Sequence, residues 1–212
     1  MATFVSDAFT EGSDTALTSH TPETGGAWNN HTGTMTVRGS TDDLVGDSSG
    51  AAAYVYNSTG PGDNDVDASV DVSHIGSGTV RGGPVIYGTL DAGRDNYMAY
   101  QASLTGNYGL AKNVDGTFTS LGSYNYGSNA TRNVLLSARP AGATKLEVFV
   151  DAVSRITSGD TDFSTFVAVG VRGYSSDILD NFSASDGTAG GGVTIGSGLT
   201  EGLKLGRVRL AA

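Results

Sequence analysis

The 212-residue sequence contains no cysteine. This absence excludes a disulfide framework, a thiolate metal site and a thiol nucleophile. The stability of the fold must therefore come from side-chain packing and from hydrogen bonds between backbone groups.

Charged residues and long apolar runs are also scarce. Charged side chains make up 16% of the chain, and 22 acidic residues against 12 Lys and Arg give a formal net charge of −10. This balance excludes a nucleic-acid partner, because binding phosphates requires clustered basic side chains. No apolar run approaches the roughly 18 residues of a membrane-spanning helix, so no membrane partner is expected. Residues 1–14 have neither a basic nor an apolar region, so no signal peptide is expected.

Short alternating runs are what the sequence has in abundance, together with 32 glycines. In residues 65–72, Val and Ala alternate with Asp and Ser, which is the period of a half-buried strand. Residues 96–104 alternate in the same way, with Met98 and Tyr100 on the predicted buried face. No segment of helical length has a 3.6-residue period. The chain is therefore predicted to be all-β.

Turn signals join several of these runs into predicted hairpins. Residues 96–112 turn at Gly106, the next turn is Asp115-Gly116, and residues 134–150 turn at Pro140. About a dozen short strands separated by such turns indicate a sandwich of two antiparallel sheets. Further extended segments are predicted at residues 3–9, 34–38, 51–57, 84–90, 166–171 and 178–183.

The composition changes after residue 186, where glycine and other small residues predominate. We therefore predict a sandwich domain at residues 1–186, followed at 187–212 by a Gly-rich linker and a C-terminal attachment strand. The tail carries three of the 12 basic residues, and we expect it to pair with a partner by strand addition. The predicted attachment residues are Leu203, Lys204, Leu205, Arg207, Val208, Arg209 and Leu210.

Several segments, taken in order, resemble the concanavalin A-like lectin and glucanase (laminin G-like) superfamily, in particular its phage-encoded modules. The resemblance implies a two-sheet antiparallel jelly roll over residues 3–185, with binding loops at its rims, and it does not include the tail. The matching segments are 7–9 (DAF), 17–23 (LTSHTPE), 25–28 (GGAW), 110–121 (LAKNVDGTFTSL), 146–151 (LEVFVD), 170–173 (GVRG) and 179–182 (LDNF).

The sequence offers no catalytic constellation. Glycoside hydrolysis requires two carboxyl groups placed on either side of one bond, and most aspartates here lie in turns, where Asp is favoured structurally. The three histidines lie in no nucleophile-elbow context, and His20 is expected to fix its own loop. We therefore expect no enzyme and no cofactor. The chain has only four glutamates, none with another nearby: Glu11, Glu23, Glu147 and Glu201.

One segment places acidic side chains at alternate positions. Asp63, Asp65 and Asp67 could supply oxygen ligands to calcium, and the alternative is a polar turn that enters a strand. The polar turn is favoured, because the segment lacks the Glu and the fixed Gly of a dedicated calcium loop.

Aromatic residues provide a second set of candidates. Tyr124, Asn125 and Tyr126 lie in a Gly-, Asn- and Ser-rich segment, a composition typical of recognition surfaces. The alternative is that these rings cover the base of a loop. Trp28, the only tryptophan, is expected to pack in or near the core.

These observations predict a non-enzymatic protein of a phage virion, either a capsid decoration (cement) protein or a fibre-associated protein. Such a protein is made in the host cytoplasm and ends on the virion surface, so it needs neither export signal nor disulfides. Its expected partners are other virion proteins and copies of itself, a trimer being simplest at capsid three-fold positions. The alternative is a carbohydrate-binding or adhesion module of a bacterial protein, in which rim loops hold a glycan.

Overall fold

The computed structural model describes residues 2–48, 50–62, 64–74, 81–93, 95–102, 105–128 and 130–187. Within these ranges two antiparallel sheets pack face to face, and the three-residue 3₁₀ turn Leu17–Ser19 is the one helical segment. The predicted all-β, two-sheet jelly-roll sandwich is confirmed. No helix in this part of the chain is long and apolar enough to cross a membrane. The predicted arm lies beyond the described residues except for Gly187, so the boundary at residue 186 stays a prediction.

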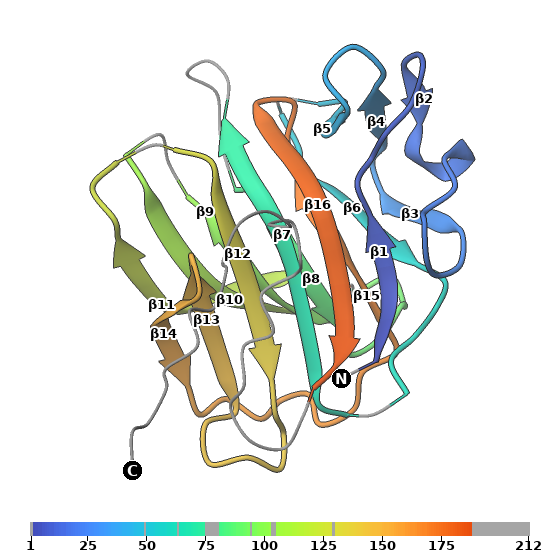
Figure 1. Ribbon diagram of the computed structural model, residues 1–212. Helices are drawn as coiled ribbons and strands as arrows, with labels where there is room; N and C mark the ends of the chain where they lie inside the picture. Colours follow the sequence, from blue (N-terminus) through green and yellow to red (C-terminus); the bar gives the residue numbers. More distant parts are fainter. Residues whose placement is uncertain are drawn as a thin grey trace, which may run out of the picture.

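The first sheet has nine strands and faces the viewer in Figure 1. Its strands, in spatial order, are β14 (Val153–Ser158), β13 (Leu146–Val150), β12 (Arg132–Ala138), β7 (Val66–His74), β16 (Asp177–Asp186), β5 (Asp43–Gly46), β4 (Met35–Arg38) and β2 (Thr15–Ala16), with β1 (Thr3–Asp7) also paired to β16. The pairing of β1 with β16 brings the two ends of the sandwich chain together.

The second sheet has seven strands and lies behind the first (Figure 1). Its strands, in spatial order, are β11 (Thr117–Asn125), β10 (Asn107–Val114), β9 (Asn96–Gln101), β8 (Gly83–Tyr87), β15 (Ala168–Gly173), β6 (Ala53–Asn57) and β3 (Trp28–Thr32). The predicted hairpins at β9–β10, β10–β11 and β12–β13 are all present.

The main core lies between the two sheets and follows the period-two alternation of the strands. In β7 the Val and Ala side chains are buried and the intervening Asp and Ser are half-buried, as predicted. In β16 the alternation is preserved by a bulge between Asp180 and Ser183. Asn181, at φ 52°, is the extra residue, and it allows both Leu179 and Phe182 to point into the core.

The seven-stranded sheet is buried on its other face as well. A second apolar cluster there consists of Tyr54, Val85, Tyr87, Met98, Tyr100, Ala111 and Ala168. The prediction for β9 was therefore incomplete, because Tyr97 and Ala99 face the main core while Met98 and Tyr100 belong to this second cluster. Every residue of β8 and β9 is buried.

A buried carboxylate joins the N-terminal strand to two neighbouring segments. Asp7 accepts hydrogen bonds from Trp28 Nε1 (2.6 Å) and the Phe9 amide (2.7 Å), and its Oδ1 lies 2.8 Å from His20 Nε2. The other ring nitrogen of His20 lies 2.7 Å from Glu11 Oε1. Burial raises the pKa of Asp7, against the lowering effect of these hydrogen bonds. The expected roles of Trp28 in the core and of His20 in fixing its loop are both confirmed.

We predict that Asp7→Asn lowers the free energy of unfolding by about 3 kcal/mol, because an amide group must turn a donor toward groups that are themselves donors. Urea denaturation, monitored by the fluorescence of Trp28, measures the free energy of unfolding directly, since Trp28 is the sole tryptophan and is 1% exposed. Glu11→Gln is the control, because Glu11 contacts only the outer side of His20 and a smaller loss is expected. Equal losses in the two variants would contradict a central role for Asp7.

The outer face of the nine-stranded sheet carries a group of acidic residues around β16. Burial is the largest cause that raises the pKa of Asp180, to about 6. Repulsion from Asp71 and Asp43 adds to it, against a hydrogen bond from the Asn181 amide (2.7 Å). The ionised form of Asp180 therefore destabilises the folded protein. The cost is fully present above about pH 6 and disappears as the pH falls toward the unfolded value near 4.

We predict that Asp180→Asn stabilises the protein by about 1 kcal/mol at pH 8, a value reduced for partial solvent screening. The advantage over the parent protein should vanish at pH 4, where the parent carboxyl is protonated. Chemical denaturation at both pH values tests this, with Asp91→Asn in an exposed loop as the matched control. A variant less stable than the parent at pH 8 would show that the ionised Asp180 side chain does not destabilise the folded protein.

Candidate functional site

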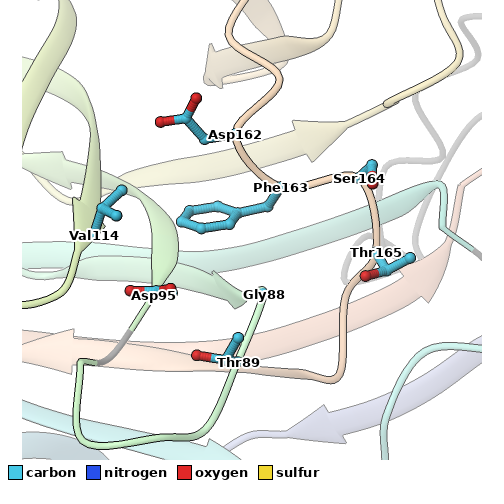
Figure 2. A pocket seen from close by; sticks show the side chains of 8 residues that line it. All are labelled: Gly88, Thr89, Asp95, Val114, Asp162, Phe163, Ser164 and Thr165. Carbon is cyan, nitrogen blue, oxygen red and sulfur yellow. The ribbon is translucent and has the colours of Figure 1, made fainter.

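A pocket of about 440 Å³ opens at one end of the sandwich. Two connections form it: the loop between β8 and β9, and the segment 159–167 that leads from β14 in one sheet to β15 in the other. The end of β10 completes its wall, and Figure 2 shows the Phe163 ring projecting among the other side chains. The lining residues are Gly88, Thr89, Asp95, Val114, Asp162, Phe163, Ser164 and Thr165.

The Phe163 ring is held in place from beneath. It meets the Tyr97 ring edge-on at 4.8 Å between centroids, and a Cβ at position 88 would lie 2.9 Å from it. Glycine at position 88 therefore lets the ring lie against the backbone of the β8–β9 connection. The amide of Phe163 also donates to Tyr97 Oη (3.1 Å), so backbone and ring are both anchored to β9.

An ion-pair network fixes the rest of this segment. Tyr97 Oη donates to Asp160 Oδ1 (2.6 Å), and Lys112 Nζ lies 2.5 Å from carboxylate oxygens of both Asp160 and Asp162. Burial acts to raise the pKa of Asp160, but hydrogen bonds from Lys112 and Tyr97 outweigh it and hold this pKa below its usual value. Asp160 therefore stabilises the fold while it is ionised.

The remaining polar groups form the rim and wall of the pocket. Asp95 Oδ1 accepts the Asp115 amide (2.8 Å), which fixes its carboxylate beside Phe163. Thr89 Oγ1 is buried and makes no hydrogen bond within the described part of the chain. Ser164 and Thr165 are exposed on the opposite side (Figure 2). The pocket thus presents one aromatic ring surrounded by carboxylates and hydroxyl groups.

The outer face of the seven-stranded sheet offers less access. Tyr87 and Met98 at its centre are completely buried. Above them Arg172, only 4% exposed, donates from Nε to Tyr54 Oη (2.8 Å) and from Nη1 to the Arg81 carbonyl (2.6 Å). These hydrogen bonds hold its guanidinium group within the protein, so the centre of this face is closed to a ligand.

The predicted tyrosine site lies elsewhere, at the side of the sandwich where β11 approaches β14. Tyr124 and Asn125 belong to strand β11, so their predicted placement in a loop was wrong. The rings of Tyr124 and Tyr126 pack partly against the main core, with the Arg132 guanidinium 3.6 Å from the Tyr126 ring centroid. Asn125 is exposed and accepts the Gly127 amide (2.8 Å). A binding role for these residues stays a prediction.

The other predicted sites are separate from the pocket around Phe163. Asp67 lies on β7, where Arg139 Nη2 contacts both of its carboxylate oxygens at 2.7 Å. Asp65 lies just before β7, and Asp63 is outside the described residues. The described residues bring no three His, Asp or Glu side chains together in an arrangement that could hold a metal ion. The predicted attachment residues at 203–210 also lie outside the described part of the chain.

Sequence reasoning missed the pocket residues, although a signal was present. Residues 160–165 read DTDFST, a single aromatic residue among Asp, Ser and Thr. The same criterion that selected the tyrosine segment would have selected Phe163. The sequence could not indicate that Gly88 and Asp95 lie beside it, because those contacts depend on the order of strands in the sheet.

Comparison with known proteins identifies the fold but no family. The sequence matches no protein-family model and has no significant match among the curated proteins. Among solved structures, it resembles the carbohydrate-binding module CBM66 from Bacillus subtilis, with a TM-score of 0.58 and 15% identity over 74% of this chain and 94% of that chain. The carbohydrate recognition domain of Emp47p gives a TM-score of 0.54 and 13% identity over 84% and 96% of the two chains.

A further similar structure belongs to a larger protein. The GH43 protein BlXynB from Bacillus licheniformis gives a TM-score of 0.55 and 11% identity, covering 85% of this chain but 39% of that one. At such identities the likeness shows the fold alone, a two-sheet antiparallel jelly roll that this chain shares with these domains. The structure therefore agrees with the superfamily resemblance at the level of fold.

We predict that Lys112→Met loosens the segment that carries Phe163, because two carboxylates lose their shared cation. The free energy of unfolding should fall by about 1 kcal/mol at pH 7. This contribution is present above the unfolded pKa of Asp160 and is lost as the pH falls through its lower folded pKa, so the difference from the parent should narrow at pH 3.

Lys145→Met is the matched control for this experiment. Lys145 Nζ donates to the Pro140 carbonyl (2.7 Å), an acceptor that does not titrate. Its effect on stability should therefore change less between pH 7 and pH 3. If the Lys112 variant showed the same difference from the parent at both pH values, the proposed coupling to Asp160 would be wrong.

Proposed function

We propose that the protein is a carbohydrate-binding module without catalytic activity, and that it holds a saccharide in the pocket around Phe163. The observation that carries the proposal is an anchored aromatic ring in an open pocket, ringed by carboxylates and hydroxyl groups. A sugar ring has an apolar face of C–H groups and a rim of hydroxyl groups, and this arrangement is complementary to both.

The pocket assigns a role to each kind of side chain. The face of the saccharide packs on Phe163, while the Asp95 and Asp162 carboxylates accept hydrogen bonds from its hydroxyl groups. The fold adds support, since two similar structures are a carbohydrate-binding module and a carbohydrate recognition domain.

Binding without hydrolysis is supported by the existing partners of the two carboxylates. Asp162 is paired with Lys112, and Asp95 accepts a backbone amide. A glycosidase needs one carboxyl group free to give a proton and a second free to attack or to activate water. In this proposal both aspartates serve to orient the ligand.

A virion surface as the place of action was predicted from the resemblance to phage-encoded modules together with the absence of cysteine and of an expected signal peptide, and it remains a prediction. A carbohydrate-binding module is compatible with that location, because a virion domain can display glycan-binding loops toward a cell surface. Partner proteins in a virion and self-association likewise remain predictions.

We predict that Phe163→Leu weakens glycan binding about tenfold, because it retains apolar volume but removes the flat ring, a change worth about 1.4 kcal/mol. The full chain is labelled and applied to a glycan array, and the strongest ligand is then titrated by calorimetry. Phe118→Leu is the matched control, since Phe118 is an exposed phenylalanine (39%) outside the pocket.

Several results would contradict the proposal. If no glycan on the array bound the protein, the proposal would be wrong. Equal affinity of the Phe163→Leu and Phe118→Leu variants would show that the ligand binds elsewhere. Release of new reducing ends from the bound oligosaccharide would show catalysis. Loss of binding in a Tyr124→Ala variant, with Phe163→Leu unaffected, would favour the site predicted from the sequence.

A further inference from the structure

A second pocket adjoins the first at Ser164. It has a volume of about 420 Å³ and is lined by Asn64, Asp65, Pro140, Ala141 and Ser164. Ser164 also lines the pocket around Phe163. The two pockets therefore meet at one exposed serine and together form a longer binding surface.

The topology explains why the pockets adjoin. Half of the residues that line the first pocket lie in the β8–β9 loop and at the end of β10, in the seven-stranded sheet, and the other half lie in the crossing from β14 to β15. The second is built on the turn between β12 and β13, strands of the nine-stranded sheet, and on the segment that leads into β7. Ser164 lies in the crossing from β14 to β15. The combined surface thus crosses the end of the sandwich from one sheet to the other.

We propose that the ligand is a chain of several uncharged sugar residues, lying across both pockets with Ser164 between them. This inference rests on the proposed function and specifies the class of its ligand. Each pocket is near the lower end of the range of about 300–1,000 Å³ for small-molecule sites, so a ligand that fills both must be extended. Pro140 offers a second apolar ring surface, and Asn64 and Asp65 offer polar groups beside it.

The charges around the two pockets select against an acidic glycan. Asp95 and Asp162 line the first pocket, and Asp65 lines the second. Two of the nearby cations are paired with carboxylates, Lys112 with Asp160 and Asp162 and Arg139 with Asp67, while Lys145 donates to the neutral Pro140 carbonyl. A polyuronate or a sulfated glycan would bring further negative charge to this acidic surface, on a protein of formal charge −10.

The test compares chain length and charge in one set of ligands. The full-length protein is titrated with gluco-, xylo- and fructo-oligosaccharides of one to six units, and with oligogalacturonates of the same lengths. Within the neutral series that binds, we expect longer chains to bind at least about tenfold more tightly than the single sugar. We expect the oligogalacturonates to bind more weakly than neutral chains of equal length. Length-independent affinity, or a preference for oligogalacturonates, would overturn the inference.

A variant in the second pocket separates this inference from the proposed function. Ala141 is exposed in the β12–β13 turn, so Ala141→Trp fills the pocket with little risk to the core. Ala141→Trp should abolish the increase in affinity with chain length and leave the affinity for the single sugar unchanged. Thr41→Trp, in the exposed turn between β4 and β5, is the matched bulky control. Asn64→Ala tests the opposite wall of the second pocket and should reduce the same increase in affinity with chain length.

The pattern of results distinguishes the two failures. If Phe163→Leu weakens every ligand but Ala141→Trp and Asn64→Ala leave long chains unaffected, the proposed function stands and the extended site is wrong. If neither neutral nor acidic saccharides bind the parent protein, both proposals are wrong. A thermal unfolding midpoint for each variant equal to that of the parent confirms that the comparison concerns binding.

Discussion

Burial of the seven-stranded sheet on both faces governs where a ligand can reach this protein. One face contributes to the main core, and the other carries the second cluster around Tyr87 and Met98. The sequences of β8 and β9 produce this arrangement, because apolar side chains occupy both sets of alternate positions. The middle of the outer face is closed, whereas two open pockets lie at the end of the sandwich.

The end of the sandwich is where strand hydrogen bonding stops and side chains must hold the backbone instead. Between β14 and β15 the chain leaves one sheet and enters the other, so its polar groups have no ladder partners. The network of Tyr97, Asp160 and Lys112 replaces that ladder and fixes the segment at the edge of β9 and β10. In this protein without cysteine, charge-assisted hydrogen bonds thus hold the segment that carries Phe163.

The sequence was sufficient to predict the strands whose two faces differ. In β7 the alternation of Val with Asp identified both the strand and its buried side. The Asp115-Gly116 turn was also clear, with φ angles of 50° and 77° that suit Asp and Gly. The turn before β14 uses the same left-handed geometry at Asp151 and Ala152, but alanine gives no such signal, and β14 was not predicted.

Other elements escaped prediction because their determinants lie far away in the sequence. The strand β3 begins at Trp28, whose burial depends on the Asp7 carboxylate and on contact with Phe182. The faces of β9 could not be assigned, because the two faces are almost equally apolar. The candidate site was missed for a related reason: the position of the Phe163 ring in the pocket depends on contacts with Gly88 and Tyr97, which lie far from it in the sequence.

The composition of a loop is therefore a weaker guide to binding than its position between the sheets. The Tyr124 and Tyr126 segment has the composition of a recognition surface, but its rings pack against arginine side chains at the edge of the core. The segment around Phe163 is similar in composition, but it connects opposite sheets and adjoins two pockets. Within this connection Phe166 is buried in the main core, whereas Phe163 is half-buried and lines the first pocket. In a sandwich whose sheet faces are filled, such crossings are the places where binding chemistry can accumulate.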